Sequence, residues 1–173
     1  GNLGITYRIN SQVTVGAAYH SKTSLSDLET GDGGAAMTAG MYGGGALFAD
    51  AGKIKVRDFQ WPETYAIGVS YQAMPQLQLV ADVKHIGWSK VMESFKMTYD
   101  SQVMGGSVNF TLPQDWKDQT VIQLGATYMV SDQLALRAGY NGSRNPIPDS
   151  YLNALFPAIV KDHYTFGVGY AFS

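Results

Sequence analysis

Three charged side chains, two of which could bind an anionic molecule, lie within segments of alternating polarity. Asp82 and Lys84 are two residues apart in one segment, and Arg137 lies in another. A guanidinium group can hold a carboxylate through two parallel hydrogen bonds, and an ammonium group can hold it as a point charge. Lys84 and Arg137 are therefore candidate carboxylate-binding residues. The alternative interpretation is a ladder of structural salt bridges that also includes Asp82.

The histidines do not form the pattern of an enzyme site. His20, His85 and His163 are the only three, and none accompanies a Gly-x-Ser-x-Gly nucleophile motif. The chain has no cysteine, no His/Asp/Glu cluster with the spacing of a catalytic metal site, and no glycine-rich stretch that opens a helix as a phosphate cradle does. The sequence therefore predicts no enzyme, no metal and no cofactor.

The composition favours β structure with many turns. The 173 residues include 45% hydrophobic but only 15% charged residues, with 20 Gly and 11 Tyr. The 12 basic and 14 acidic residues are scattered, so the basic stripe that nucleic-acid binding needs is missing. No apolar run approaches the ~18 residues of a membrane-spanning helix. Strands that span a bilayer need only about 9–11 alternating residues, which fits the mean hydropathy of -0.10.

A Gly-x-x-Tyr pattern occurs four times along the chain. In the first three copies, a glutamine follows the tyrosine after a four-residue linker and leads to a second alternating segment. Alternation with period two on both sides of a short linker is typical of a β-hairpin. The four copies are Gly4 to Tyr7, Gly68 to Tyr71, Gly125 to Tyr128 and Gly167 to Tyr170, and the linkers are 8–11, 72–75 and 129–132.

The repeat predicts about seven antiparallel strands. Their expected ranges are 2–9, 12–22, 63–72, 76–89, 118–130, 133–142 and 163–172. The opposite strand ends are joined by long segments at 22–63, 89–118 and 141–163. Short turns at one end and long loops at the other are typical of an outer-membrane barrel. The predicted fold class is all-β, an antiparallel transmembrane β-barrel present here as a partial barrel.

Residues in phase with the tyrosines are apolar, and those of the opposite parity are small or polar. In a membrane barrel, the first set faces lipid and the second faces the lumen. The tyrosines beside the short turns would form an interfacial girdle. A soluble β-sandwich or calyx, with the apolar face as its core, is the alternative. The predicted lumen set is Thr6, Thr14, His20, Ser70, Gln78, Asp82, Lys84, Gln123, Thr127, Arg137, Asn141, Thr165 and Gly167.

Several motifs resemble the outer-membrane transporters of long-chain fatty acids and aromatic hydrocarbons. The most specific run is Trp116-Lys117-Asp118, followed by Leu124 to Tyr128, Leu136 to Tyr140 and Asn145-Pro146-Ile147-Pro148-Asp149. The resemblance implies a 14-stranded barrel with an N-terminal plug, through which hydrophobic molecules diffuse. On this reading residues 1–173 are a single partial barrel domain that lacks the plug and the last strands. The parent protein would be a monomer surrounded by bacterial outer-membrane lipid.

Two apolar stretches in the long connections are candidate ligand-binding segments. Trp88, Met92 and Phe95, with Met97, form a soft aromatic and sulfur-rich stretch. A second stretch would form a short helix lining an apolar access site; it contains Tyr151, Leu152, Leu155 and Phe156. Simple packing explains both stretches equally well. Residues 33–49, rich in Gly, Ala and Met, are expected to form an extracellular loop that inserts apolar side chains.

The predicted function is passive uptake of hydrophobic molecules, either long-chain fatty acids or aromatic hydrocarbons. Lys84 and Arg137 would contact the carboxylate of a fatty acid. Two alternatives stay open: a lipid hydrolase embedded in a barrel, and a structural or adhesive barrel. The residues do not distinguish between the two cargo classes.

Overall fold

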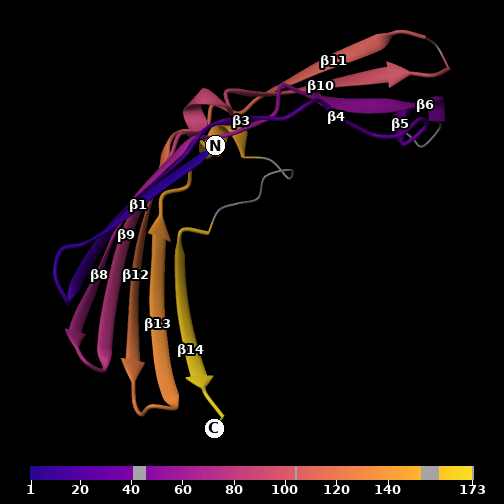
Figure 1. Ribbon diagram of the computed structural model, residues 1–173. Coiled ribbons are helices and arrows are strands. Elements are labelled where there is room, and N and C mark those ends of the chain that lie inside the picture. The colour runs from indigo at the N-terminus through magenta and orange to yellow at the C-terminus, as the bar shows by residue number, and fades with distance from the viewer. Residues whose placement is uncertain (41–45, 104, 153–159, 173) are drawn as a thin grey trace.

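A computed structural model describes residues 1–40, 46–103, 105–152 and 160–172. The described chain is built almost entirely of β-strands (Figure 1). Its only helical elements there are two 3₁₀ turns, η1 (Trp88–Lys90) and η2 (Asp149–Tyr151). Neither of these helical elements is long and apolar enough to cross a membrane.

The main sheet has seven strands in the order β1-β2-β8-β9-β12-β13-β14, and every neighbouring pair is antiparallel. It is curved and open, with β1 and β14 at its edges (Figure 1). The seven predicted strands are all present, with ends shifted by at most a few residues. They are β1 (Asn2–Arg8), β2 (Val13–His20), β8 (Thr64–Met74), β9 (Leu77–Ile86), β12 (Gln119–Met129), β13 (Leu134–Ser143) and β14 (Asp162–Tyr170).

Local side-chain hydrogen bonds explain two of the short turns. Asn10 Oδ1 accepts hydrogen bonds from the backbone amides of Gln12 and Val13, both at 2.8 Å, which closes the β1–β2 turn. Ser131 Oγ accepts from the Leu134 amide at 3.2 Å in the β12–β13 turn. Asn and Ser favour turns because their side chains bond the backbone a few residues ahead. The predicted hairpins are therefore confirmed.

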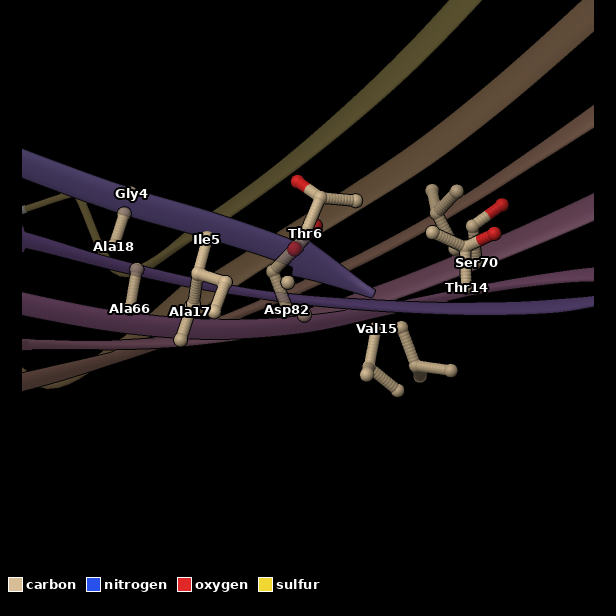
Figure 2. Close-up of a pocket in the computed structure, with 14 residues that line it drawn as sticks. Gly4, Ile5, Thr6, Thr14, Val15, Ala17, Ala18, Ala66, Ser70 and Asp82 are labelled. Carbon is tan, nitrogen blue, oxygen red and sulfur yellow. The ribbon is translucent and has the colours of Figure 1, made fainter. Parts of the chain in front are cut away.

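The strand register places one alternating set of side chains on the same face across the whole main sheet. Thr14 is paired with Ser70, Gly68 with Asp82, and Asp82 in turn with Gln123. Directly paired residues point to the same face. In Figure 2, Thr6, Thr14 and Ser70 lie on one side of the ribbons and Val15 lies on the other. All the residues predicted for the lumen therefore share one face.

The apolar face of the main sheet is exposed rather than packed. Ile5 is 70%, Ile67 69% and Phe166 85% accessible. A soluble sandwich would have to bury these side chains in its core. An apolar face without a cover is expected where strands contact lipid.

Tyrosines mark both ends of the apolar face. Near the short turns lie Tyr7, Tyr71, Tyr128 and Tyr170, as the repeat predicts. A second row, which the repeat does not predict, lies near the long connections and consists of Tyr19, Tyr65, Tyr140 and Tyr164. Its members stack in pairs, Tyr19 on Tyr65 at 4.9 Å and Tyr140 on Tyr164 at 5.1 Å between ring centroids. Two aromatic rows that flank an apolar band match the two interfaces of a membrane.

The segments expected to be loops contain a second sheet. Its order is β11-β10-β6-β4, with β5 paired to β6, and it extends from the end of the main sheet opposite the short turns (Figure 1). The strands are β4 (Leu28–Glu29), β5 (Ala35–Gly40), β6 (Ala46–Arg57), β10 (Ser94–Ser101) and β11 (Ser107–Pro113). Two short strands, β3 (Thr23–Ser24) and β7 (Gln60–Trp61), form a third sheet.

The second sheet corrects the loop prediction, and its sequence explains why. Lys53, Lys55 and Arg57 alternate with apolar residues in β6, and Lys96, Thr98 and Asp100 do so in β10. The polar sides meet across the pair: Lys55 lies 3.0 Å from Asp100. Within the segment 33–49, expected to be a loop, residues 35–40 lie in β5 and 46–49 lie in β6, and 41–45 are outside the described residues.

A small hydrophobic core joins the two larger sheets. It consists of Met92, Trp116 and Ile147, with Phe59, Trp88, Val91 and Phe95 packed against it. Aromatic rings continue through this core, with centroid separations of 5.0 Å for Trp88–Trp116 and 6.3 Å for Trp61–Trp88. The cluster forms where the long connections leave β9 and return to β12.

Candidate functional site

An open cavity of about 870 Å³ lies at the loop end of the polar face. Strands β1, β2, β8 and β9 supply its floor, and η1 and β7 supply two tryptophans. Most of its lining is apolar, which suits a hydrophobic ligand. The principal lining side chains are Ala18, Trp61, Ala66, Ile86 and Trp88, with the polar groups His20 and Lys84.

The cavity adjoins a second depression that runs further down the polar face. Gly4, Ala18 and Ala66 line both spaces. The second depression has a volume of about 460 Å³ and is edged by the hydroxyls of Thr6, Thr14 and Ser70 and the carboxylate of Asp82 (Figure 2). Small residues therefore line the junction of the two spaces. We call Gly4, Ala18 and Ala66 the small-residue track.

Trp88 reaches the cavity because η1 is tied to the main sheet from two sides. Its neighbour Ser89 donates its backbone amide to Asp118 Oδ1 at 2.9 Å. On the other side, Lys90 Nζ binds Glu63 Oε1, and Tyr65 donates its hydroxyl to Glu63 Oε2 at 3.1 Å. A 3₁₀ turn of three residues has little stability of its own. Its position therefore depends on these contacts.

The two carboxylates that hold η1 are stabilised as anions. The hydrogen bond from Lys90, followed by the one from Tyr65, lowers the pKa of Glu63 below its ordinary value. The Ser89 backbone amide is the main reason that the pKa of Asp118 is lowered. Hydrogen bonds to the charged form of an acid have this effect. Both acids are ionised at neutral pH.

Lys84 lies in the cavity, but the predicted salt-bridge ladder does not form. Lys84 is paired with Ala66 and Val121, and no ion pair joins Asp82, Lys84 or Arg137 within the described residues. A cation that lines an apolar cavity without an ionic partner can serve an anionic or oxygen-bearing ligand.

Arg137 lies far from Lys84, near the short turns. It is paired with Thr127, six residues along β12 from Val121, the partner of Lys84. Six residues of strand span about 20 Å. The two predicted carboxylate contacts therefore cannot grip one headgroup together. Binding by either one stays a prediction.

The predicted aromatic and sulfur-rich stretch is divided between the core and the cavity. Met92 is only 2% exposed and belongs to the hydrophobic core, and Phe95 packs against that core. Trp88 contacts the core and also lines the cavity. Packing thus accounts for Met92 and Phe95, while ligand contact by all three stays a prediction.

The second predicted stretch is only partly described. Tyr151 ends η2, a single 3₁₀ turn, and Leu152 follows it; the rest of the expected short helix lies outside the described residues. They are 37% and 46% exposed. Leu155 and Phe156 lie outside the described residues. A role for these four side chains in ligand access stays a prediction.

Sequence reasoning missed Trp61, Ile86 and Leu3 as cavity residues. Trp61 directly precedes Pro62-Glu63 and lies outside the repeated hairpins. Its ring packs at 5.6 Å from Phe59 and 6.3 Å from Trp88 between centroids. The parity of Ile86 matches that of Lys84 and could have indicated its place. Leu3 also borders the cavity, although its pairing with Tyr19 places its side chain on the apolar face.

The histidines do not assemble a catalytic group. His85 Nε2 lies 3.7 Å from Asp118 Oδ2, and His20 Nδ1 lies 2.9 Å from the Ser21 carbonyl. Among the described residues, the His163 side chain has no hydrogen-bond or ion-pair partner, and no three His, Asp or Glu side chains are grouped as metal ligands. Within the part of the chain that the structure describes, the three histidines therefore form no catalytic group.

A family model described as outer membrane protein transport protein (OMPP1/FadL/TodX) matches residues 2–173. The chain belongs to this family. The expected resemblance is thus confirmed, and the chain is part of a bacterial outer-membrane transport protein with an antiparallel barrel fold. No curated protein sequence matches the chain.

Solved channels of this family share the fold. The toluene transporter TodX of Pseudomonas putida is 33% identical, with a TM-score of 0.79, and the match covers 99% of this chain and 39% of that one. The toluene transporter TbuX of Ralstonia pickettii is 28% identical, with a TM-score of 0.78, covering 99% and 38%. The monoaromatic hydrocarbon channel CymD is 28% identical, with a TM-score of 0.82, covering 99% and 42%.

The chain therefore spans about two fifths of the length of these channels. Its matched relatives are transporters and channels rather than enzymes. The remaining three fifths of such a barrel would complete the walls around the cavity.

Proposed function

We propose that the full-length protein takes up monoaromatic hydrocarbons passively across the outer membrane. A molecule would rest in the cavity beside Trp61 and Trp88 and then move along the small-residue track past Ala66. No covalent step and no cofactor are required. The observation that supports this proposal most is a largely apolar cavity, lined by two tryptophans, on the polar face of the main sheet.

A cavity that serves passive transport needs to bind its cargo only moderately. Flat aromatic ligands gain contact area against tryptophan rings in offset or edge-to-face arrangements. An open, partly apolar cavity gives moderate affinity, and release down a gradient requires moderate affinity. The printed descriptions of TodX, TbuX and CymD, which name toluene and monoaromatic hydrocarbons, support this cargo class for the present chain.

Long-chain fatty acids are the second candidate cargo. Lys84 lines the same cavity and has no ionic partner within the described residues. An ammonium group in an apolar site would favour a carboxylate strongly. The two cargo classes differ in their need for Lys84, so one substitution separates them.

The test uses a deletion strain that expresses the full-length gene. Initial uptake of labelled toluene and of a labelled long-chain fatty acid is measured for wild type, Trp88→Ala and Lys84→Met. The proposal expects toluene uptake that depends on the gene, decreases in Trp88→Ala and persists in Lys84→Met. If fatty acid uptake alone depends on the gene and is lost in Lys84→Met, the second candidate is correct. Equal toluene uptake with and without the gene would refute the proposal.

The hydrolase alternative is tested with purified protein. Purified, refolded protein is incubated with a chromogenic ester, and His163→Ala is the matched variant. Turnover that disappears in His163→Ala would support hydrolysis over transport.

We further propose that residues 1–173 work as one barrel domain and that the full-length protein is a monomer in contact with outer-membrane lipid.

A further inference from the structure

The loop end of the main sheet holds a second set of residues whose contacts converge on one short segment, 87–90. This segment has hydrogen bonds to two separate places on the sheet rim. Glu63 precedes β8 and Asp118 precedes β12, so the two acids belong to strands on either side of β9. Neither acid lines the cavity. Both acids instead contact segment 87–90, which carries Trp88.

On the Glu63 side, the contacts involve both backbone and side chain. The Gly87 amide donates to the Glu63 carbonyl at 3.0 Å, and Lys90 forms an ion pair with the Glu63 carboxylate. The fit is close: a Cβ atom at Gly87 would lie 3.3 Å from Glu63 Cγ. Glu63 therefore holds both ends of the segment.

On the Asp118 side, the contact is made by Ser89, the residue next to Trp88. The Ser89 amide donates to Asp118 Oδ1 at 2.9 Å, while Asp118 Oδ2 lies 3.7 Å from His85 Nε2. The first amides of a helical turn have no partner within the turn. Asp118 supplies that partner from a different strand and so orients the turn relative to the sheet.

We propose that Asp118 and Glu63 are positioning residues that hold Trp88 against the cavity and thereby set its affinity for the transported molecule. The inference rests on the proposed function, because Trp88 must contact the cargo. Neither acid touches the cargo itself. A loosened η1 would leave Trp88 free to turn away from Trp61, its neighbour at 6.3 Å across the cavity wall.

A double-mutant cycle in the full-length protein tests the inference. Concentration-dependent toluene uptake is measured for wild type, Asp118→Ala, Trp88→Ala and the double variant. We expect Asp118→Ala to raise the half-saturation concentration by roughly two- to tenfold, the effect of one lost hydrogen bond of ordinary strength. Once Trp88 is absent, Asp118→Ala should have almost no further effect, because coupled residues are not additive.

Two further variants separate positioning from general structural damage. Asp118→Asn keeps an oxygen that can accept the Ser89 amide, so its uptake should stay close to wild type. Asp162→Ala is the matched control, since Asp162 is another rim carboxylate that accepts a hydrogen bond, from the Tyr140 hydroxyl at 2.7 Å. It does not contact η1, and its uptake should equal that of wild type.

The outcomes are distinct. An equal effect of Asp118→Ala with and without Trp88, or no effect in wild type, would overturn the inference while toluene uptake by wild type still supports the proposed function. Absence of wild-type uptake would overturn both. If Asp118→Ala fails to reach the folded barrel, Glu63→Ala provides the same cycle from the other side of η1, with the same expected result.

Discussion

Gly68 and Asp82 face each other across the β8–β9 pair, and a Cβ atom at Gly68 would overlap Asp82 Oδ1. The glycine of the Gly-x-x-Tyr repeat thus provides space for a carboxylate on the lumen face. The clash involves the end of a side chain that can rotate. It limits where Asp82 can lie but does not involve the backbone.

The first prediction contrasts this glycine with Gly52. A Cβ atom at Gly52 would overlap the Asp100 carbonyl oxygen and approach the Tyr99 ring to 2.7 Å. Backbone cannot yield as a side chain does, so Gly52→Ala should destabilise the protein by about 2 kcal/mol or more, and Gly68→Ala by about 1 kcal/mol or less. Thermal unfolding of the full-length barrel in detergent measures both. Equal losses of stability in Gly52→Ala and Gly68→Ala would contradict the distinction between a backbone contact at Gly52 and a side-chain contact at Gly68.

The second prediction uses two adjacent residues of β8. Ser70 shares the lumen face with Thr14, whereas Val69 lies on the apolar face and is 39% exposed. The chain has no cysteine, so Val69→Cys and Ser70→Cys each introduce a single thiol into it. A water-soluble maleimide applied to membranes should label Ser70→Cys and leave Val69→Cys unlabelled. Labelling of both at similar rates would show that the apolar face meets water.

The third prediction concerns pH and the Glu63–Lys90 pair. Hydrogen bonding lowers the pKa of Glu63 in the folded protein. The ionised Glu63 carboxylate therefore stabilises the fold fully at pH values above its ordinary pKa of 4.5, and this stabilisation is lost as the pH falls below that value. The difference in unfolding temperature between wild type and Glu63→Gln should therefore be largest at neutral pH and shrink as the pH falls through 4 and below. A difference independent of pH would show that the pair does not stabilise the rim.

Much of this architecture was predictable from residue alternation, because one face of the main sheet meets lipid. In β8 the alternation of Ile67 and Val69 with Gly68 and Ser70 fixes both strand type and facing, since a slip of one residue would expose every polar group to lipid. The hairpin turns were equally accessible, since Asn10 and Ser131 favour turns through local hydrogen bonds.

The second sheet and the cavity were harder to predict. The alternation in β6 and β10 is present, but it lies in segments that also contain glycine runs and aromatic residues, so the sequence alone predicts loops there. The cavity depends on residues brought together from separate strands and turns. Trp61 and Trp88 are 27 positions apart. Pairing of β7 with β3 positions Trp61, and the contacts of Glu63 and Asp118 with segment 87–90 help to position Trp88.

The fourth prediction tests most directly whether cargo passes through the cavity. Ala66 lines the cavity, whereas the next residue, Ile67, lies on the apolar face and is 69% exposed. Ala66→Cys and Ile67→Cys are expressed in the full-length protein, cells are treated with benzyl methanethiosulfonate, and toluene uptake is then measured. The attached benzyl group should block uptake at position 66 and not at position 67, and excess toluene should slow modification at position 66 alone. Unchanged uptake after complete modification of Ala66→Cys would contradict passage through this cavity.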